Sequence, residues 1–298
     1  MAWTARDLPD LTGTTAVVTG ANSGIGFHTA RELAVHGADV VLACRNVEAG
    51  REAAARMAGT PRVEHLDLAS QQSVREFADR WQGPLDLLVN NAGVMTPPRY
   101  RTTEDGHELM FGTNHLGHFA LTGRLLPALL EADSPRVVTV ASVAHHGGSE
   151  RVIEANPEKG YRAQAYYGNS KLANILFARA LQRRAEAAGS TLISTGAHPG
   201  VSATELVADP NGMGANPVIR VTAPYFTKVL FQSAAAGANP SLYAATVAEP
   251  GSYTGPTRMG EWRGPIGPAK LSKHARNDEL GDRLWTLSEN LTGVTYPF

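Results

Sequence analysis

From Thr15 to His198 the chain alternates short apolar runs with longer segments of helical periodicity. This alternation is typical of repeated βαβ units, in which helices connect parallel strands. Runs such as ADVVLAC and PRVVTVAS are almost continuously apolar, which favours strands covered on both faces of a parallel sheet. The predicted strands lie at 15–19, 39–44, 63–67, 85–90, 136–142 and 191–197, and the predicted helices at 25–36, 48–57, 70–81, 104–130 and 167–188.

The chain after His198 has a different composition. Residues 205–240 mix Gly, Pro and Asn with apolar side chains, and 249–269 contain still more Gly and Pro. Flexible linkers are usually poorer in apolar residues, so this part favours a partly helical lid over an apolar ligand. We also expect a last strand at 252–255 and a terminal amphipathic helix at 277–289.

The charge balance argues against nucleic acid as a partner. The 298 residues include 27 Lys+Arg and 28 Asp+Glu, which gives a formal net charge of -1. Proteins that bind a phosphate backbone need a concentrated basic surface, and the sequence has no dense basic run. The length allows either one large α/β domain or two smaller domains.

The number of cysteines and the lack of long apolar runs indicate the cellular compartment of the protein. Cys44 is the single cysteine, which excludes an intrachain disulfide and a cysteine-based metal cluster within one subunit. The N-terminal residues do not have the pattern of a secretory signal, and no apolar run approaches the ~18 residues of a membrane span. We therefore expect a soluble cytoplasmic protein without a membrane partner.

A glycine-rich turn follows the first predicted strand and leads directly into a helix. It reads Thr19-Gly20-Ala21-Asn22-Ser23-Gly24-Ile25-Gly26. Such a turn lets backbone N–H groups approach a pyrophosphate, while the helix N-terminus offers partial positive charge to the anion. A tight turn without a ligand is the alternative, but the strand before it and the helix after it favour dinucleotide binding.

The end of the second strand indicates which dinucleotide the chain prefers. Proteins that prefer NAD usually carry an acid there, which accepts hydrogen bonds from the ribose 2′-hydroxyl. Here the sequence is Ala43-Cys44-Arg45-Asn46, which contains no carboxylate. Arg45 is suited to pair with a 2′-phosphate, so NADP(H) is the preferred cofactor, and NAD(H) is the alternative.

A tyrosine and a lysine stand four residues apart in Tyr167-Gly168-Asn169-Ser170-Lys171, at the predicted start of a helix. At that spacing both side chains share one helix face. A tyrosine with its ordinary pKa of about 10 is a poor acid–base catalyst at neutral pH unless a nearby cation lowers that pKa. Lys171 is placed to have this effect, and Ser142 ends a strand that points into the same crevice.

Together with these motifs, three further ones resemble the short-chain dehydrogenase/reductase family: Asn90-Asn91-Ala92-Gly93, the NHLGHF segment that contains Asn114, and Pro199-Gly200 followed by Thr204. The resemblance implies one Rossmann-type domain over 1–298, with a doubly wound parallel sheet of seven strands in a three-layer α/β/α arrangement. Residues 202–269 would contain the substrate-binding lid.

The same resemblance implies the site. The catalytic tetrad would be Asn114, Ser142, Tyr167 and Lys171. Tyr167 would exchange a proton with the substrate oxygen, Ser142 would hydrogen-bond that oxygen, Lys171 would lower the pKa of Tyr167 and hold the nicotinamide ribose, and Asn114 would keep a water in the proton relay. The implied cofactor-binding residues are Gly20, Asn22, Ser23, Gly24, Ile25, Gly26, Arg45, Asp67, Leu68, Asn91, Ala92, Gly93, Tyr167, Lys171, Pro199, Gly200 and Thr204.

Within the family, ACRN, NHLGHF and the His198-Pro199-Gly200 segment are similar to the retinol dehydrogenase and protochlorophyllide reductase-like branch. Soluble ketoreductases of bacterial secondary metabolism share this branch. The apolar side chains of 205–240 predict a pocket for a bulky hydrophobic carbonyl compound or alcohol, with lid packing or a subunit contact as the alternative. The resemblance also implies a homodimer or homotetramer that assembles through the helices of Asn114 and Tyr167.

Two other interpretations remain open at this point. A catalytically silent NADP(H)-binding regulatory or scaffold protein would use the same fold, although such proteins often lose a member of the tetrad. His145-His146 follows Ser142 and would suit a metal site, but no third ligand is evident at matching spacing, so we expect a loop or substrate contact and no metal. His115 and His118 are interpreted as structural residues on a helix face.

Overall fold

The computed structural model describes residues 3–200 and 232–298. Its described part is built on an eight-stranded sheet in the order β3-β2-β1-β4-β5-β6-β7-β8. The strands are β1 (Thr15–Thr19), β2 (Asp39–Cys44), β3 (Arg62–His65), β4 (Leu87–Asn90), β5 (Arg136–Val140), β6 (Ile193–Ala197), β7 (Tyr253–Arg258) and β8 (Arg263–Pro268).

The pairing is parallel from β3 through β7 and antiparallel between β7 and β8. The predicted doubly wound parallel sheet is thus confirmed, and one antiparallel strand extends it beyond the predicted seven. The chain builds the sheet outward from β1 in one direction and from β4 in the other, so the strand order reverses between these two strands.

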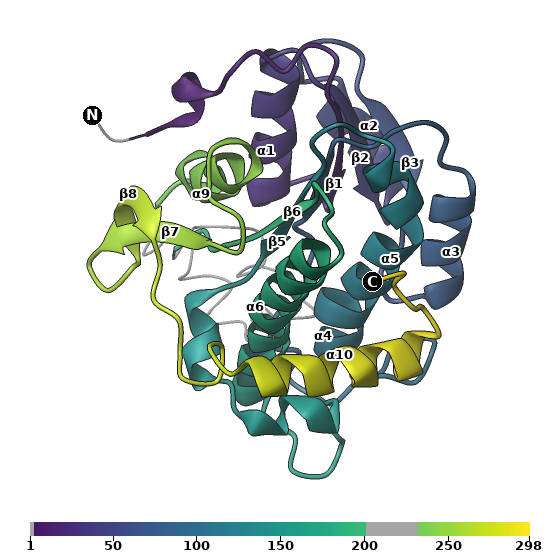
Figure 1. The fold of residues 1–298 in the computed structure, drawn as a ribbon, viewed down its shortest axis with the longest axis vertical. Coiled ribbons are helices and arrows are strands. Elements are labelled where there is room, and N and C mark those ends of the chain that lie inside the picture. The colour runs from purple at the N-terminus through teal and green to yellow at the C-terminus, as the bar shows by residue number, and fades with distance from the viewer. Residues whose placement is uncertain (1–2, 201–231) are drawn as a thin grey trace.

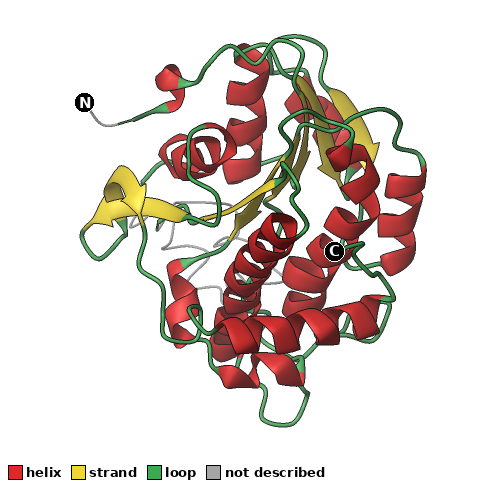
Figure 2. Cartoon of the chain, viewed as in Figure 1, coloured by secondary structure: helices red, strands yellow, loops and turns green. Residues whose placement is uncertain are grey.

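Helices cover both faces of the sheet (Figures 1 and 2). One layer contains α1 (Gly24–Val35), α2 (Val47–Ala54) and α9 (Ala234–Thr246). The other contains α3 (Gln71–Asp79), α5 (Gly117–Leu130) and α6 (Ala163–Ala187). Alternation along β1 explains why its three central residues are all apolar: Val17 packs in the second layer, whereas Ala16 and Val18 pack in the first.

The helix predicted at 104–130 is shorter and interrupted. It starts with the single turn α4 (Leu109–Phe111), continues through the π-helical turn η2 (Gly112–Leu116), and then becomes α5. Residues 104–107 lie outside it, in a turn that an isolated bridge closes between Thr102 and Glu108. Asn114 stands in the middle of the π turn, a kind of irregularity that is frequent at functional sites.

The helix of Tyr167 begins earlier than predicted. α6 starts at Ala163, so Tyr167 lies a full turn inside the helix instead of at its start. A position inside the helix holds the Tyr167 backbone more firmly than a position at its end would, because the terminal turns of helices fray.

The range predicted to contain a lid, 202–269, is described from 232 onward. There it forms α9, β7 and β8. α9 packs against α1 and the central strands, so this part belongs to the core layers of the domain. Residues 201–231, which include Thr204 and most of the predicted apolar pocket, lie outside the described residues.

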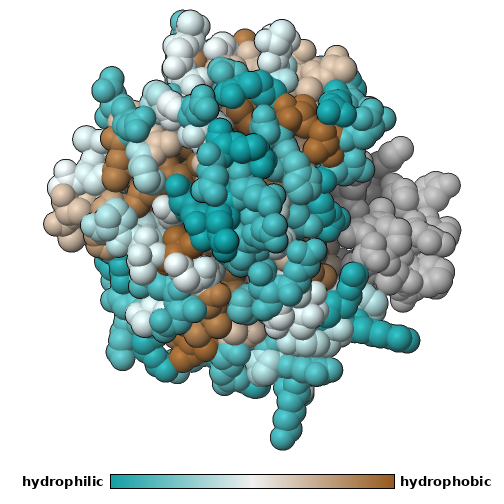
Figure 3. Space-filling model, turned by 90° about the vertical axis from the view of Figure 1, so that its right-hand side faces the viewer, coloured by the Kyte–Doolittle hydropathy of each residue, from teal (hydrophilic) through white to brown (hydrophobic). Residues whose placement is uncertain are grey.

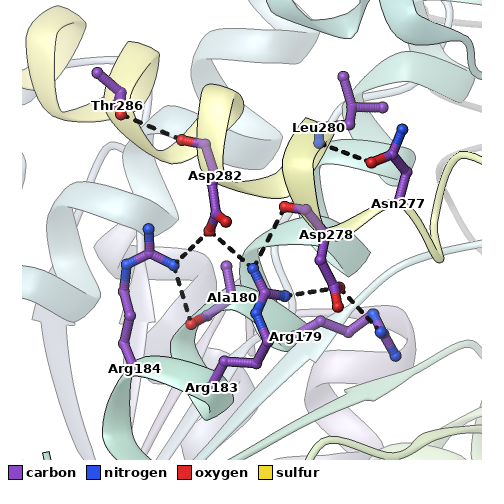
Figure 4. A network of polar contacts seen from close by, with 9 residues as sticks. All are labelled: Arg179, Ala180, Arg183, Arg184, Asn277, Asp278, Leu280, Asp282 and Thr286. Atoms are coloured by element: carbon purple, nitrogen blue, oxygen red, sulfur yellow. Dashed lines mark hydrogen bonds and ion pairs between the residues drawn. The ribbon is translucent and has the colours of Figure 1, made fainter. Parts of the chain in front are cut away.

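The C-terminal helix α10 (Asp278–Thr292) crosses α6 on the outside of the second layer. Its Trp285 is buried and stacks on Phe177 of α6, with ring centroids 5.9 Å apart. Three arginines of α6 reach two aspartates of α10: Arg183 contacts both Asp278 and Asp282 at 2.8 Å, and Arg179 and Arg184 each contact one (Figure 4).

The face of the molecule in Figure 3 is mostly hydrophilic, with hydrophobic residues in small separate patches. Within 3–200 and 232–298, no helix is both long and apolar enough to cross a membrane.

Candidate active site

A cavity of about 590 Å³ opens at the carboxyl ends of the central strands. Its walls come from the turns that follow β1 and β4, between which the strand order reverses, and from the ends of β2 and β5. Open α/β sheets bind their ligands in this crevice. Of the residues predicted to contact the cofactor, those that line the cavity are Gly20, Asn22, Ser23, Gly24, Ile25, Gly26, Arg45, Asp67, Leu68, Asn91, Ala92, Gly93, Tyr167, Lys171 and Pro199.

The glycine turn is shaped by close backbone approach. A Cβ on Gly26 would lie 2.4 Å from the carbonyl oxygen of Gly20 and 2.4 Å from Asn91 Nδ2. Gly20 and Gly24 have φ values of +64° and +58°, which favour glycine. These constraints keep side chains out of the turn and leave backbone N–H groups accessible, so the turn fits the pyrophosphate of a dinucleotide.

The N-terminus of α1 supports the same ligand. Ser23 is the N-cap residue, yet its hydroxyl makes no capping hydrogen bond to the described residues. The first N–H groups of the helix therefore remain available to an anion at the positive end of the helix dipole.

Arg45 follows β2 on the wall of the cavity and is exposed. Among the residues that the structure describes, no carboxylate forms an ion pair with its guanidinium. Its neighbour Asn46 uses its side chain to cap α2, where it accepts the N–H of Ala49 at 3.1 Å. An unpaired arginine beside a nucleotide cleft is suited to a 2′-phosphate.

The structure brings Ser142, Tyr167 and Lys171 together. Ser142 follows β5, and its side chain accepts the N–H of Ala144 at 3.1 Å and lies close enough to Tyr167 to lower the pKa of the phenol. Lys171 Nζ lies 5.8 Å from the centroid of the Tyr167 ring and donates to the carbonyl oxygen of Val140 at 3.3 Å. Both Tyr167 and Lys171 line the cavity.

Asn114 lies behind this wall and is fully buried. Its Oδ1 accepts the N–H of Val94 at 2.7 Å, and its Nδ2 donates to the Val94 carbonyl oxygen and to Ser170 Oγ, each at 3.0 Å. Asn114 thus connects the segment after β4 to the helix that carries Tyr167 and Lys171.

Burial shifts the pKa values of Tyr167 and Lys171 in opposite directions. It raises the pKa of Tyr167 to about 12, and the nearby Ser142 side chain offsets only part of this effect. It lowers the pKa of Lys171 to about 8. The sequence predicted that Lys171 lowers the pKa of Tyr167, but here desolvation outweighs any such effect, so the phenol is neutral at physiological pH.

Two predicted cofactor residues are not among those that line the cavity of the described residues. Gly200 does not line the cavity formed by the described residues; it follows Pro199 with φ +68° and donates its N–H to His198 Nδ1 at 3.2 Å. Thr204 is among the residues that are not described.

Sequence reasoning also missed six residues of the cavity wall: Ala43, Leu66, Val94, Thr113, Val140 and Ala141. Most of them are apolar residues at or just beyond strand ends. Nothing in their residue types separates them from core residues, so only their position at a carboxyl end of the sheet could have indicated them.

His145 is buried and held by hydrogen bonds. Its Nε2 accepts the N–H of Ser272 at 3.2 Å, which leaves the proton on Nδ1 for the carbonyl oxygen of Ser142 at 2.8 Å. Its role here is to connect the loop after β5 to the segment before α10. The described residues contain no group of three or more His, Cys, Asp or Glu side chains arranged to bind a metal ion.

The chain is similar to known dehydrogenases over nearly its whole length. Residues 14–213 match the family model of short chain dehydrogenases. The chain is 39% identical to retinol dehydrogenase 12 of Mus musculus over 292 residues, which cover 95% of this chain and 88% of that protein. It is 41% identical to polyprenol dehydrogenase of Mus musculus over 300 residues, which cover 96% of this chain and 86% of that protein.

A solved structure gives the same result at the level of the fold. An uncharacterized protein from Mycobacterium paratuberculosis is 41% identical to this chain, and the match covers 100% of both chains with a TM-score of 0.84.

Proposed function

The chain belongs to the short-chain dehydrogenase family, and on that premise we propose that it is an NADP(H)-dependent oxidoreductase of hydrophobic alcohols and carbonyl compounds. One observation carries the proposal: the glycine turn and the Tyr167–Lys171 pair line the same cavity. When bound, the cofactor would supply or accept a hydride at the nicotinamide ring. The chain itself must then bind the dinucleotide and move one proton to or from the substrate oxygen.

Tyr167 carries the proton. Its phenol carries a proton at neutral pH that it can donate to a carbonyl oxygen in the direction of reduction. The raised pKa of Tyr167 opposes this transfer, so the transfer depends on stabilisation of the phenolate. The Ser142 hydroxyl, which lies near the phenol, would hold the same substrate oxygen. The ammonium of Lys171 would stabilise the phenolate that remains after the proton has left. In alcohol oxidation the same groups act in reverse.

The preference for NADP(H) rests on Arg45. It is a cation on the cavity wall without a carboxylate partner among the described residues, and the strand end lacks the acid that an NAD-preferring site would use. A 2′-phosphate would supply the missing partner.

The substrate class rests on the relatives. Retinol and polyprenol, which appear in the names of the relatives, are both long apolar alcohols. We therefore propose a bulky hydrophobic primary alcohol or the corresponding aldehyde as substrate.

The test is a screen of NADPH oxidation with hydrophobic aldehydes, ketones and quinones. We expect turnover with apolar aldehydes, a lower KM for NADPH than for NADH, and loss of turnover in Tyr167→Phe with NADPH affinity retained. Near-normal turnover in Tyr167→Phe would contradict the mechanism. NADPH binding without oxidation of the cofactor across the whole panel would favour the catalytically silent regulatory protein instead.

A further inference from the structure

His118 makes contacts that the proposed mechanism does not use. It is the second residue of α5, directly after the π turn, and it is 1% exposed. Its Nδ1 lies 2.9 Å from the carbonyl oxygen of Asn114, and its Nε2 lies 2.9 Å from Thr19 Oγ1. The sequence indicated only a structural histidine on a helix face.

The hydrogen bonds around His118 fix where each proton lies. A carbonyl oxygen only accepts, so the bond to Asn114 places the imidazole proton on Nδ1. Thr19 Oγ1 accepts the N–H groups of Asn91 and Ala92, each at 2.9 Å. Its hydroxyl proton has two acceptors in reach, His118 Nε2 at 2.9 Å and the Val89 carbonyl oxygen at 3.4 Å, and Nε2 is the closer one. One neutral tautomer thus satisfies every group. Burial favours that neutral form, because it lowers the pKa of His118 to about 4.

The two partners of His118 belong to the two halves of the candidate site. Thr19 ends β1, directly before Gly20, and its hydroxyl holds the Asn91-Ala92 backbone on the cavity wall. Asn114 holds Val94 and Ser170 on the side of the catalytic helix. Within the described part of the chain, His118 is the side chain that hydrogen-bonds both Thr19 and Asn114.

We propose that His118 is a positioning residue that couples the cofactor cradle to the catalytic helix, with Nε2 orienting the Thr19 hydroxyl and Nδ1 fixing Asn114. This inference rests on the proposed function. It implies that the two nitrogens have separable effects: the bond to Thr19 supports cofactor binding, and the bond to Asn114 supports turnover.

Two substitutions separate the two bonds. The amide of an asparagine is attached where Nδ1 is in histidine, one bond beyond Cγ, so His118→Asn retains a donor for the Asn114 carbonyl. A glutamine amide reaches as far as Nε2, so His118→Gln retains an acceptor for the Thr19 hydroxyl. His118→Leu removes both bonds at similar bulk.

The measurements are the dissociation constant of NADPH from fluorescence titration without substrate, kcat at saturating NADPH, and Tm. In His118→Asn we expect NADPH binding about tenfold weaker and a kcat near that of the unmodified protein. In His118→Gln we expect near-normal NADPH binding and a kcat about tenfold lower, and in His118→Leu both losses.

His115 provides a matched control. It is also fully buried and lies three residues earlier, but its Nε2 donates to Ser288 Oγ of α10 at 2.8 Å, away from the cofactor cradle. His115→Gln should lower Tm and leave both the NADPH dissociation constant and kcat within about threefold.

Equal behaviour of the Asn and Gln variants in both measurements would overturn the coupling role of His118, whether both resemble the unmodified protein or both resemble His118→Leu. Failure of the unmodified protein to bind NADPH would instead overturn the proposed function, and with it this role.

Discussion

At the scale of single residues, desolvation sets the charge of the Tyr167–Lys171 pair. The partly buried phenol of Tyr167 holds its proton more tightly than a tyrosine in water, whereas the buried ammonium of Lys171 releases its proton more easily. Both shifts favour the neutral forms, as desolvation requires. At neutral pH the pair therefore consists of a neutral phenol and an ammonium, and Lys171 is the group that titrates first when the pH rises.

The rate of carbonyl reduction should therefore fall above about pH 8. The lowered pKa means that Lys171 is an ammonium below this pH and neutral above it, so the stabilisation of a phenolate is lost as the pH rises. We expect kcat/KM to decrease up to about tenfold per pH unit on this alkaline limb of the pH profile. Lys171→Arg, which stays charged, should move the limb to higher pH. A limb that begins above pH 9.5 in the unmodified protein would contradict this assignment.

A methyl group at Gly26 should block the cofactor turn. The added Cβ would meet the Gly20 carbonyl oxygen and Asn91 Nδ2, each at 2.4 Å, so both must move or the helix must shift. We expect Gly26→Ala to weaken NADPH binding by about tenfold or more in fluorescence titration. Gly281→Ala is the control, because its nearest contacts, at 3.8 Å, are ordinary, and alanine in α10 should stabilise the fold by about 0.5–1 kcal/mol.

At the scale of elements, α10 is held by two kinds of contact. The aspartates that pair with α6 are about half exposed, and ion pairs between exposed groups contribute little. Trp285 is 4% exposed and packs against Phe119, Phe177 and Tyr296. Aromatic burial must therefore contribute more to the docking of α10 than the conspicuous network of Figure 4.

Two variants measure this difference. Trp285→Ala should lower the free energy of unfolding by about 3–5 kcal/mol, whereas the double variant Asp278→Asn with Asp282→Asn should lower it by about 1 kcal/mol. Urea denaturation with fluorescence or circular dichroism measures both values. A larger loss in the double variant than in Trp285→Ala would show that the ion pairs dominate.

The elements differ in how well the sequence predicts them. The strands β1, β2, β4 and β5 combine apolar runs with flanking turns, so periodicity is sufficient to find them. β8 reads RGPIGP, a composition that disfavours strands, and it forms because β7 pairs with it. α9 contains Gly237 and Pro240, which weaken a helix unless it is packed, as it is here against α1.

In the candidate site, too, the sequence predicts some features and not others. Its glycine turn and the Tyr167–Lys171 spacing are local patterns, so the sequence predicts them directly. The π turn at Asn114 is invisible to a helical period, because one added residue per turn changes no residue type. The contact between Thr19 and His118 joins positions 99 residues apart, and only the fold brings them together.

At the scale of the whole molecule, four histidines are buried in neutral form. Burial lowers the pKa of His118 and His145 to about 4 and that of His115 and His198 to about 3. Unfolding would expose all four to water, where their pKa is about 6.5. Below that pH the unfolded chain therefore binds protons that the folded chain excludes.

The fold should consequently lose stability steeply in mild acid. Each of these histidines removes about 1.4 kcal/mol per pH unit as the pH falls below 6.5, until the pKa of the folded state is reached. The four together remove about 5 kcal/mol per unit, against a typical total of about 5–15 kcal/mol. Urea denaturation at pH 7.5, 6.5 and 5.5 gives the pH dependence of the free energy of unfolding, and hence the number of protons that the chain binds when it unfolds. His115→Gln should lower this number by one. An uptake below one proton would contradict the prediction.

The packing of the C-terminal segment also bears on assembly. Trp285 and Tyr296 lie against Phe119 of α5 and Phe177 of α6, the helices through which the sequence predicted a homodimer or homotetramer. Tyr296 also donates its hydroxyl proton to the carbonyl oxygen of Phe119 at 2.7 Å. An assembly on this side of the molecule would have to use the outer surface of α10.

The two outermost strands of the sheet limit how copies of this chain can meet. β8 contains Pro265 and Pro268, which have no N–H to offer a further strand, and the short β3 carries Arg62, Glu64 and His65. Within the described residues, both rims of the sheet thus resist the addition of another chain's backbone. The folded protein is in this way guarded against growth into fibrous aggregates.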